Sequence, residues 1–190
     1  MSYDFSAVRA QFPALNQPAE DGKLPVFFDN PAGTQVPQAV YDAITEFYMH
    51  MNANAGGAFA TSQRNDAMMQ EARETLADFL NAPRADEIVF GPNMTTLNFS
   101  LSRALAQTLQ PGDEIILTRM DHDANVTPWT LIARDRGLDV KWIDVNTDDA
   151  TLDLNTYEAA LSQRTKLVAV VHASNAVGTI NPIKQIVEMA

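Results

Sequence analysis

The sequence has no cysteine, which excludes disulfide bonds, thiolate metal ligands and a thiol nucleophile from this chain. It is also poor in basic residues, because 13 Lys and Arg stand against 24 Asp and Glu and give a net charge of −11. Phosphate backbones are bound by clustered Lys and Arg, so nucleic acid is not an expected partner. No apolar run is long enough to cross a bilayer, and the first residues lack the layout of a signal peptide. We therefore expect a soluble, cytoplasmic protein with no membrane partner.

The composition that remains is that of a globular chain. Hydrophobic residues make up 46% and charged residues 19% of 190 residues, enough for a domain with a sizeable core. Pro13, Pro18 and Pro25 interrupt the first 25 residues, which we predict to be an N-terminal arm. Residues 26–190 are predicted to form the packed domain.

Hydrophobic periodicity predicts the elements of that domain. Apolar residues recur at steps of three and four in two helices, which we place at about 40–51 and 66–80. Strands and helices then alternate, with strands at 87–90, 114–118, 140–145 and 166–171 and helices at 94–109, 128–136, 154–163 and from 183. This alternation predicts an α/β fold of three layers, a mostly parallel sheet with helices on both faces. The last helix has no closing strand after it, so we expect the sheet to be incomplete.

Three polar loops follow predicted strands, at residues 91–96, 119–125 and 172–179. Ligands of such sheets bind outside the carboxyl ends of the strands. We therefore expect these loops to lie along one edge and to form the functional site.

The loop "GPNMTT" precedes a helix. Asn93 fits the N-cap position, so the backbone N–H groups of Met94, Thr95 and Thr96 would open the helix at the positive end of its dipole. A phosphate group fits there. The alternative is a capped helix that binds nothing. No Walker or G-x-G-x-x-G pattern occurs, which disfavours nucleotide binding.

The loop "MDHDANVTPW" carries a histidine between two aspartates. Thr127 and Pro128 fit a helix start, so His122 would lie in the loop before the helix. A metal site is weakly supported, because adjacent side chains in an extended loop point in different directions. An imidazole lying flat over an aromatic cofactor is equally consistent, and it would leave a nitrogen free for proton transfer. The histidine could also merely bond to a neighbouring carboxylate or carbonyl.

The loop "HASNAVGT" follows the most apolar predicted strand. The amide of Asn175 could donate a hydrogen bond to a ligand oxygen. The alternative is an Asx-type turn, which asparagine forms readily.

Taken together, these loops resemble a known family. "FFDNPAGTQVP", "VFGPNMTTLNFSLSRAL", "MDHDANVTPW" and "HASNAVGTINPI" occur in order and at suitable spacing. They are similar to the class V aminotransferase family of fold-type I pyridoxal-phosphate enzymes, and most similar to its cysteine desulfurase and selenocysteine lyase branch. The resemblance implies the large domain of such an enzyme, with pyridoxal 5′-phosphate as cofactor and no metal.

The resemblance also implies roles for single residues in the cofactor site. The backbone of Met94 and the side chain of Thr95 would hold the cofactor phosphate. His122 would stack on the pyridine ring and serve as the catalytic group that moves protons. Asn175 would hydrogen-bond to the phenolic oxygen of the ring.

Beyond the cofactor, the resemblance implies a substrate side and a partner. Ala32 and Gly33 would line the side on which a small amino-acid substrate binds. Residues 56–64 would face the site of a partner subunit, because members of the family are usually homodimers.

The family's chemistry needs a lysine that binds the cofactor and a carboxylate that protonates its ring, both after the segment that matches Asn175. The four lysines here (Lys23, Lys141, Lys166 and Lys184) do not lie in a matching context. We therefore expect the N-terminal part of an enzyme that cleaves a C–S or C–Se bond, and expect this chain alone to be inactive. The alternative is a truncated, non-catalytic fragment or a binding module with a partial cofactor site.

Overall fold

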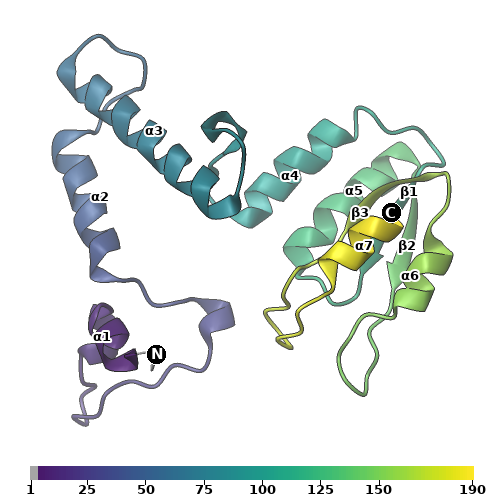
Figure 1. The fold of residues 1–190 in the computed structure, drawn as a ribbon, viewed down its shortest axis with the longest axis horizontal. Helices are drawn as coiled ribbons and strands as arrows, with labels where there is room; N and C mark the ends of the chain where they lie inside the picture. The colour runs from purple at the N-terminus through teal and green to yellow at the C-terminus, as the bar shows by residue number, and fades with distance from the viewer. Residues whose placement is uncertain (1–3) are drawn as a thin grey trace. The chain divides into compact units, whose positions relative to one another are not determined.

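A computed structural model describes residues 4–190, which form two compact units (Figure 1). The first unit extends to Phe90, and the second runs from Gly91 to Ala190. No helix in the described part of the chain is long and apolar enough to span a membrane. The predicted boundary between an arm and a domain at residue 25 stays a prediction.

The first unit is helical. Its elements are α1 (Phe5–Ala10), η1 (Pro13–Asn16), η2 (Asn30–Ala32), α2 (Gln38–His50), α3 (Ala60–Leu80) and η3 (Ala85–Glu87), where η marks a 3₁₀ helix. The predicted first helix corresponds to α2 within two residues at each end. The predicted second helix is confirmed, but it begins six residues earlier than its apolar pattern indicates.

Polar side chains explain the early start of α3. The Ser62 hydroxyl donates to the Asn54 carbonyl at 2.6 Å and accepts from the Gly57 N–H at 2.8 Å. The Asp66 carboxylate accepts from the Gly56 N–H at 3.0 Å. The first two turns of α3 therefore fasten the preceding loop, a role that hydrophobic periodicity does not reveal.

The strand predicted at 87–90 is wrong. Residues 85–87 form η3 and Ile88 is extended, but residues 88–90 have no strand partner among the described residues. Val89 and Phe90 are exposed to 75% and 44%. A β-strand depends on backbone hydrogen bonds to a neighbour, so an apolar, β-branched composition alone does not form one.

The second unit contains a parallel sheet of three strands, β1 (Glu114–Thr118), β2 (Asp139–Ile143) and β3 (Thr165–Ala169), in the order β2-β1-β3. Near the carboxyl ends, Leu117 of β1 lies opposite Trp142 of β2 and Ala169 of β3. Every residue of the central strand is buried. The predicted α/β class and parallel sheet are confirmed, with strand ends within two residues of those predicted.

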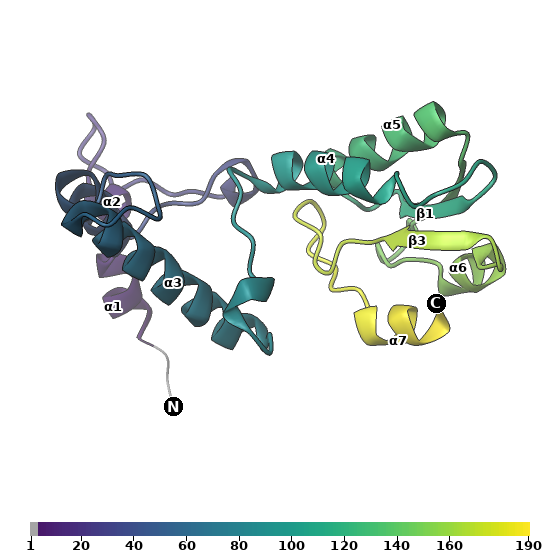
Figure 2. The same cartoon turned by 90° about the horizontal axis from the view of Figure 1, so that it is seen from above.

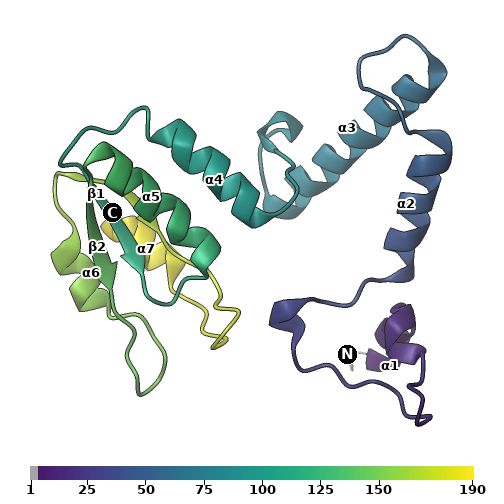
Figure 3. The same cartoon turned by 180° about the vertical axis from the view of Figure 1, so that it is seen from behind.

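Helices cover both faces of this sheet. Figure 2 shows α4 (Met94–Leu105) and α5 (Thr127–Arg136) on one side of the sheet, and α6 (Leu154–Ala160) and α7 (Ile183–Met189) on the other. In the view of Figure 3, α5 lies in front of the sheet. Ile115 and Leu117 of β1 belong to the core beside α5. Ile116 belongs to the core that includes α6 and α7. The period of two along β1 thus builds both cores.

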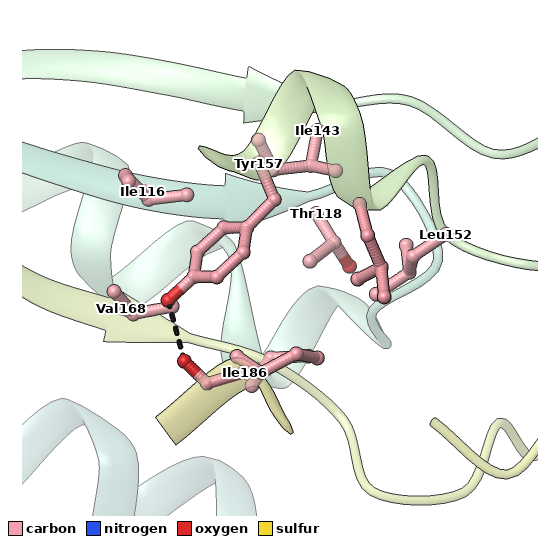
Figure 4. Close-up of a pocket in the computed structure, with 9 residues that line it drawn as sticks. Ile116, Thr118, Ile143, Leu152, Tyr157, Val168 and Ile186 are labelled. Carbon is pink, nitrogen blue, oxygen red and sulfur yellow. Dashed lines mark hydrogen bonds between the residues drawn. The ribbon is translucent and has the colours of Figure 1, made fainter. Parts of the chain in front are cut away.

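A small cavity lies within the second of these cores (Figure 4). Its walls are almost entirely apolar, with Ile116, Ile143 and Val168 from the three strands. The Tyr157 hydroxyl donates to the Ile186 carbonyl at 3.0 Å, and burial raises the pKa of Tyr157. With its polar groups already paired, this cavity is an imperfection of the core and not a site for chemistry.

Candidate functional site

The start of α4 leaves two backbone donors available. Asn93 is extended, and its side-chain oxygen accepts from the Thr96 N–H at 2.9 Å, as an N-cap does. The N–H groups of Met94 and Thr95 come earlier in the helix and have no intrahelical acceptor. Both residues are exposed. The sequence-predicted N-cap is confirmed, and it leaves these two donors and the Thr95 hydroxyl for an anion.

His122 is the N-cap residue of η4 (Asp123–Asn125) and lies in the loop that follows β1. Its Nδ1 accepts a hydrogen bond from the Ala124 N–H at 3.1 Å, so the proton of the neutral ring is on Nε2. The residue is exposed. One edge of the imidazole is therefore fixed to the backbone, while the ring remains accessible for stacking.

The aspartates beside His122 are engaged elsewhere. Asp121 accepts from the Asn125 amide at 2.6 Å and from the Thr118 hydroxyl. Asp123 accepts from the Thr127 hydroxyl at 2.6 Å. Within residues 4–190, no group of three or more His, Asp and Glu is arranged to hold a metal ion. The two aspartates shape the loop around the histidine.

The turn that carries Asn175 is formed by its neighbour. The buried Ser174 hydroxyl accepts from the N–H groups of Ala176 and Val177, each at 3.3 Å. Asn175 is exposed, and its side-chain amide makes no hydrogen bond within residues 4–190. The Asx-turn alternative is therefore wrong, because Ser174 supplies the turn and leaves the Asn175 amide for a ligand.

Two other asparagines tie the three loops together. Asn98, one turn into α4, donates to the Ala124 carbonyl and to the Asn125 side-chain oxygen, both at 3.0 Å. The buried Asn181 donates to the Val171 carbonyl at 2.7 Å and approaches the Met120 sulfur at 3.4 Å. The first links α4 to the His122 loop, and the second links that loop to the one after β3. The predicted assembly of the three loops at one edge of the sheet is thus supported by direct contacts.

Sequence reasoning missed these linking residues. Their partners in the His122 loop lie 26, 27 and 61 residues away in the chain, so no local pattern connects them. A weak signal existed at Asn98, which lies four residues before the buried Ser102 and hence on the inward face of α4. A polar residue at such a position usually has a specific partner.

The predicted substrate-side residues belong to the first unit. Ala32 ends η2, and Gly33 follows it with an N–H that donates to the Asn30 carbonyl at 3.0 Å. Both are exposed. Their position on the substrate side stays a prediction, as does the role of residues 56–64 toward a partner subunit.

Each of the four lysines has a partner of its own. Lys23 pairs with Asp21 at 3.2 Å and Lys184 with Glu188 at 3.9 Å, while Lys166 donates to the Gln163 carbonyl at 3.1 Å. Lys141 contacts Glu114 at 2.8 Å. Glu114 begins β1, so that pair lies at the amino end of the sheet, opposite the three loops.

Comparison with known proteins agrees with this geometry. The family model described as "Aminotransferase class-V" matches residues 26–190. A probable cysteine desulfurase of Mycolicibacterium paratuberculosis is 41% identical over 98% of this chain, and a cysteine desulfurase of Dickeya dadantii is 37% identical over 99%. The apo structure of a cysteine desulfurase from Thermococcus onnurineus superposes over the whole chain with a TM-score of 0.88 and 30% identity.

The matched relatives are much longer than this chain. It spans 27% of the M. paratuberculosis protein, 46% of the D. dadantii protein and 45% of the T. onnurineus structure. The chain corresponds to the N-terminal portion of these homologues.

Proposed function

This chain belongs to the aminotransferase class-V family, which depends on pyridoxal phosphate, and we propose that it forms the N-terminal part of a cysteine desulfurase-like enzyme. The intact enzyme would act on a small amino acid and cleave its C–S or C–Se bond. The observation that carries the proposal is the set of three loops at one sheet edge, held by Asn98 and Asn181. These loops carry the unpaired N–H groups at the start of α4, the accessible imidazole of His122 and the unbonded amide of Asn175.

The residues fit a flat ring that carries a phosphate group. The N–H groups of Met94 and Thr95, with the Thr95 hydroxyl, would bind the phosphate at the positive end of α4. His122 would lie against the face of the ring, and its Nε2 would hold or release a proton. Asn175 would donate from its amide to the phenolic oxygen. When bound, pyridoxal phosphate supplies an electron sink for the bonds at the α-carbon of an amino acid.

We propose that the lysine that binds the cofactor covalently is none of the four in this chain. None of the four lies in the three loops, and Lys141 is held by a buried carboxylate at the opposite edge of the sheet. Ala32 and Gly33 would line the substrate side of the site, and a homodimer would place residues 56–64 toward a partner subunit. The position of the lysines outside the three loops favours one alternative for the chain by itself, a non-catalytic module that holds part of the cofactor.

The direct test uses the full-length gene product loaded with pyridoxal phosphate. With L-cysteine and an added thiol reductant, which supplies the two electrons that convert the released sulfur to sulfide, we expect sulfide and alanine in equal amounts. With L-selenocysteine and the same reductant, we expect selenide and alanine. Transamination products without release of sulfide or selenide would move the enzyme to another activity of the family. A protein that binds the cofactor but transforms neither amino acid would support the non-catalytic alternative.

A further inference from the structure

Asn98 lies on the inward face of α4, where a polar side chain needs a partner. The inward face of the helix continues through Ser102 and Ala106, both buried. Asn98 itself is only half-buried, yet both hydrogens of its amide are used, toward the Ala124 carbonyl and the Asn125 side-chain oxygen. An amide at such a position costs free energy unless it is bonded, so these contacts explain why it is tolerated there.

The orientation of this contact is fixed by a chain of hydrogen bonds. The indole N–H of Trp129 can only donate, and it donates to the Asn125 side-chain oxygen at 3.0 Å. The Asn125 amide then points the other way and donates to Asp121 at 2.6 Å. Asn98 must therefore present its N–H groups, and not its oxygen, to the His122 loop. The Asn125 backbone N–H also donates to the His122 carbonyl at 2.8 Å, which carries the constraint to the histidine itself.

We propose that Asn98 is a positioning residue, which sets the spacing between the phosphate-binding start of α4 and the ring-binding His122. This inference rests on the proposed function. Pyridoxal phosphate joins its phosphate to its ring through a short methylene–oxygen link, so two anchors on separate elements bind it tightly only when their separation lies within the reach of that link. Figure 2 shows α4 beside α5, and the hydrogen bonds of Asn98 join α4 to the segment before α5.

The test distinguishes an effect on the spacing between the two anchors from an effect on either anchor alone. In the full-length apo-enzyme, Asn98→Leu keeps the branched shape of the side chain and removes both donors. We expect its dissociation constant for pyridoxal phosphate to rise roughly tenfold, the value of one or two net hydrogen bonds. Its dissociation constants for inorganic phosphate and for pyridoxal, which each occupy one anchor, should stay within about twofold of the wild type. The Trp129 indole N–H resonance should shift, because Asn125 loses one of its two donors.

Asn155→Leu is the matched control, since Asn155 is exposed on α6 and its side chain has no bond among the described residues. It should change none of these values. Equal weakening of phosphate and pyridoxal phosphate by Asn98→Leu would overturn the inference, because Asn98 would then act on the helix start alone. Unchanged affinity for pyridoxal phosphate would overturn it too, while the proposed function stood. A wild-type apo-enzyme that does not bind pyridoxal phosphate would overturn the proposed function first and the inference with it.

Discussion

Glu114 is a buried carboxylate at the start of the central strand, and two positively charged side chains contact it. Lys141 contacts it at 2.8 Å and Arg164 at 2.6 Å, and the Ser162 hydroxyl donates to it at 2.6 Å. The bond from Lys141 first, then the bond from Ser162 and the charge of Arg164, lower the pKa of Glu114 from 4.5 to about 2. Removing a partner from such a buried group leaves a charge uncompensated, so the cluster holds the amino end of the sheet together.

The lowered pKa gives stability a defined dependence on pH. Because the folded pKa lies below the unfolded one, the charged Glu114 stabilises the fold fully above about pH 4.5, and this contribution is lost as the pH falls toward about 2. We expect Glu114→Gln to lower the free energy of unfolding at neutral pH and to flatten its fall across that window. Urea unfolding followed by circular dichroism over the same range measures both effects. Glu158→Gln, at an exposed position of α6, is the control, and an equal slope in wild type and Glu114→Gln would refute the assignment.

His122 has a prediction of its own. If its imidazole lies on the cofactor ring, His122→Ala should weaken cofactor binding roughly two- to tenfold, the value of a stacked aromatic pair, and should slow turnover further through loss of proton transfer. The absorbance of the bound cofactor and the rate of sulfide release measure the two effects. His50→Ala removes an exposed imidazole from α2 and should leave both unchanged. A cofactor spectrum and rate equal to the wild type in His122→Ala would remove the histidine from the site.

Single residues also show which parts of the site could be predicted from the sequence. The N-cap at Asn93 and the loop position of His122 follow from local chemistry within four residues, and both could be predicted. The Asn175 amide is unbonded because the Ser174 hydroxyl accepts the hydrogen bonds of the turn. Serine and asparagine can both form such a turn, so the sequence alone does not show which of the two neighbours does so. The contacts of Asn98 and Asn181 cross the fold, and only the packed chain brings their partners together.

At the scale of elements, the contrast between residues 87–90 and β1 shows what composition does not determine. "EIVF" and "EIILT" read alike, yet only the second is a strand. β1 has hydrogen-bonded neighbours on both sides, whereas residues 88–90 have none within the described part of the chain. Helices satisfy their backbone internally, and each of the predicted helices is present, although α3 begins earlier than its apolar pattern indicates.

The helix ends suggest a test at this scale. α5 ends at Gly137 with φ of +69°, and α3 ends at Asn81 with φ of +54°, so two residue types fill the same left-handed position. A Cβ at residue 137 would lie 3.7 Å from the Pro111 side chain, an ordinary contact, so only the backbone conformation opposes a substitution. We expect Gly137→Ala to cost about 1 kcal/mol in free energy of unfolding, and Gly137→Asn clearly less.

Chemical denaturation of the two variants beside the wild type measures these differences. Gly33→Ala is a suitable control for stability, because Gly33 is extended and an added Cβ would meet no atom within 4 Å. Equal costs for alanine and asparagine at residue 137 would show that the left-handed conformation is not what the position requires.

At the scale of the whole molecule, exposed large apolar side chains accompany a net charge of −11. The outward side of α4 carries Met94, Leu97, Leu101 and Leu105, which are between 36% and 49% exposed. Exposed apolar patches of this kind drive association, while the shared negative charge opposes it. The 190-residue chain should therefore associate as its concentration rises, and more strongly at high salt, where the repulsion is screened.

Sedimentation velocity over a wide range of concentration tests this expectation, and paired variants identify the surface. Leu101→Glu removes apolar area from α4 and adds a charge, whereas Ser100→Glu adds the same charge at an exposed polar position of the same helix. If the α4 surface drives association, Leu101→Glu should reduce it well beyond the effect of Ser100→Glu, because only the first change removes the apolar contact. Equal effects would mean that charge alone controls association. A single monomeric species at every concentration and salt level would show that these exposed side chains do not bring copies of the chain together.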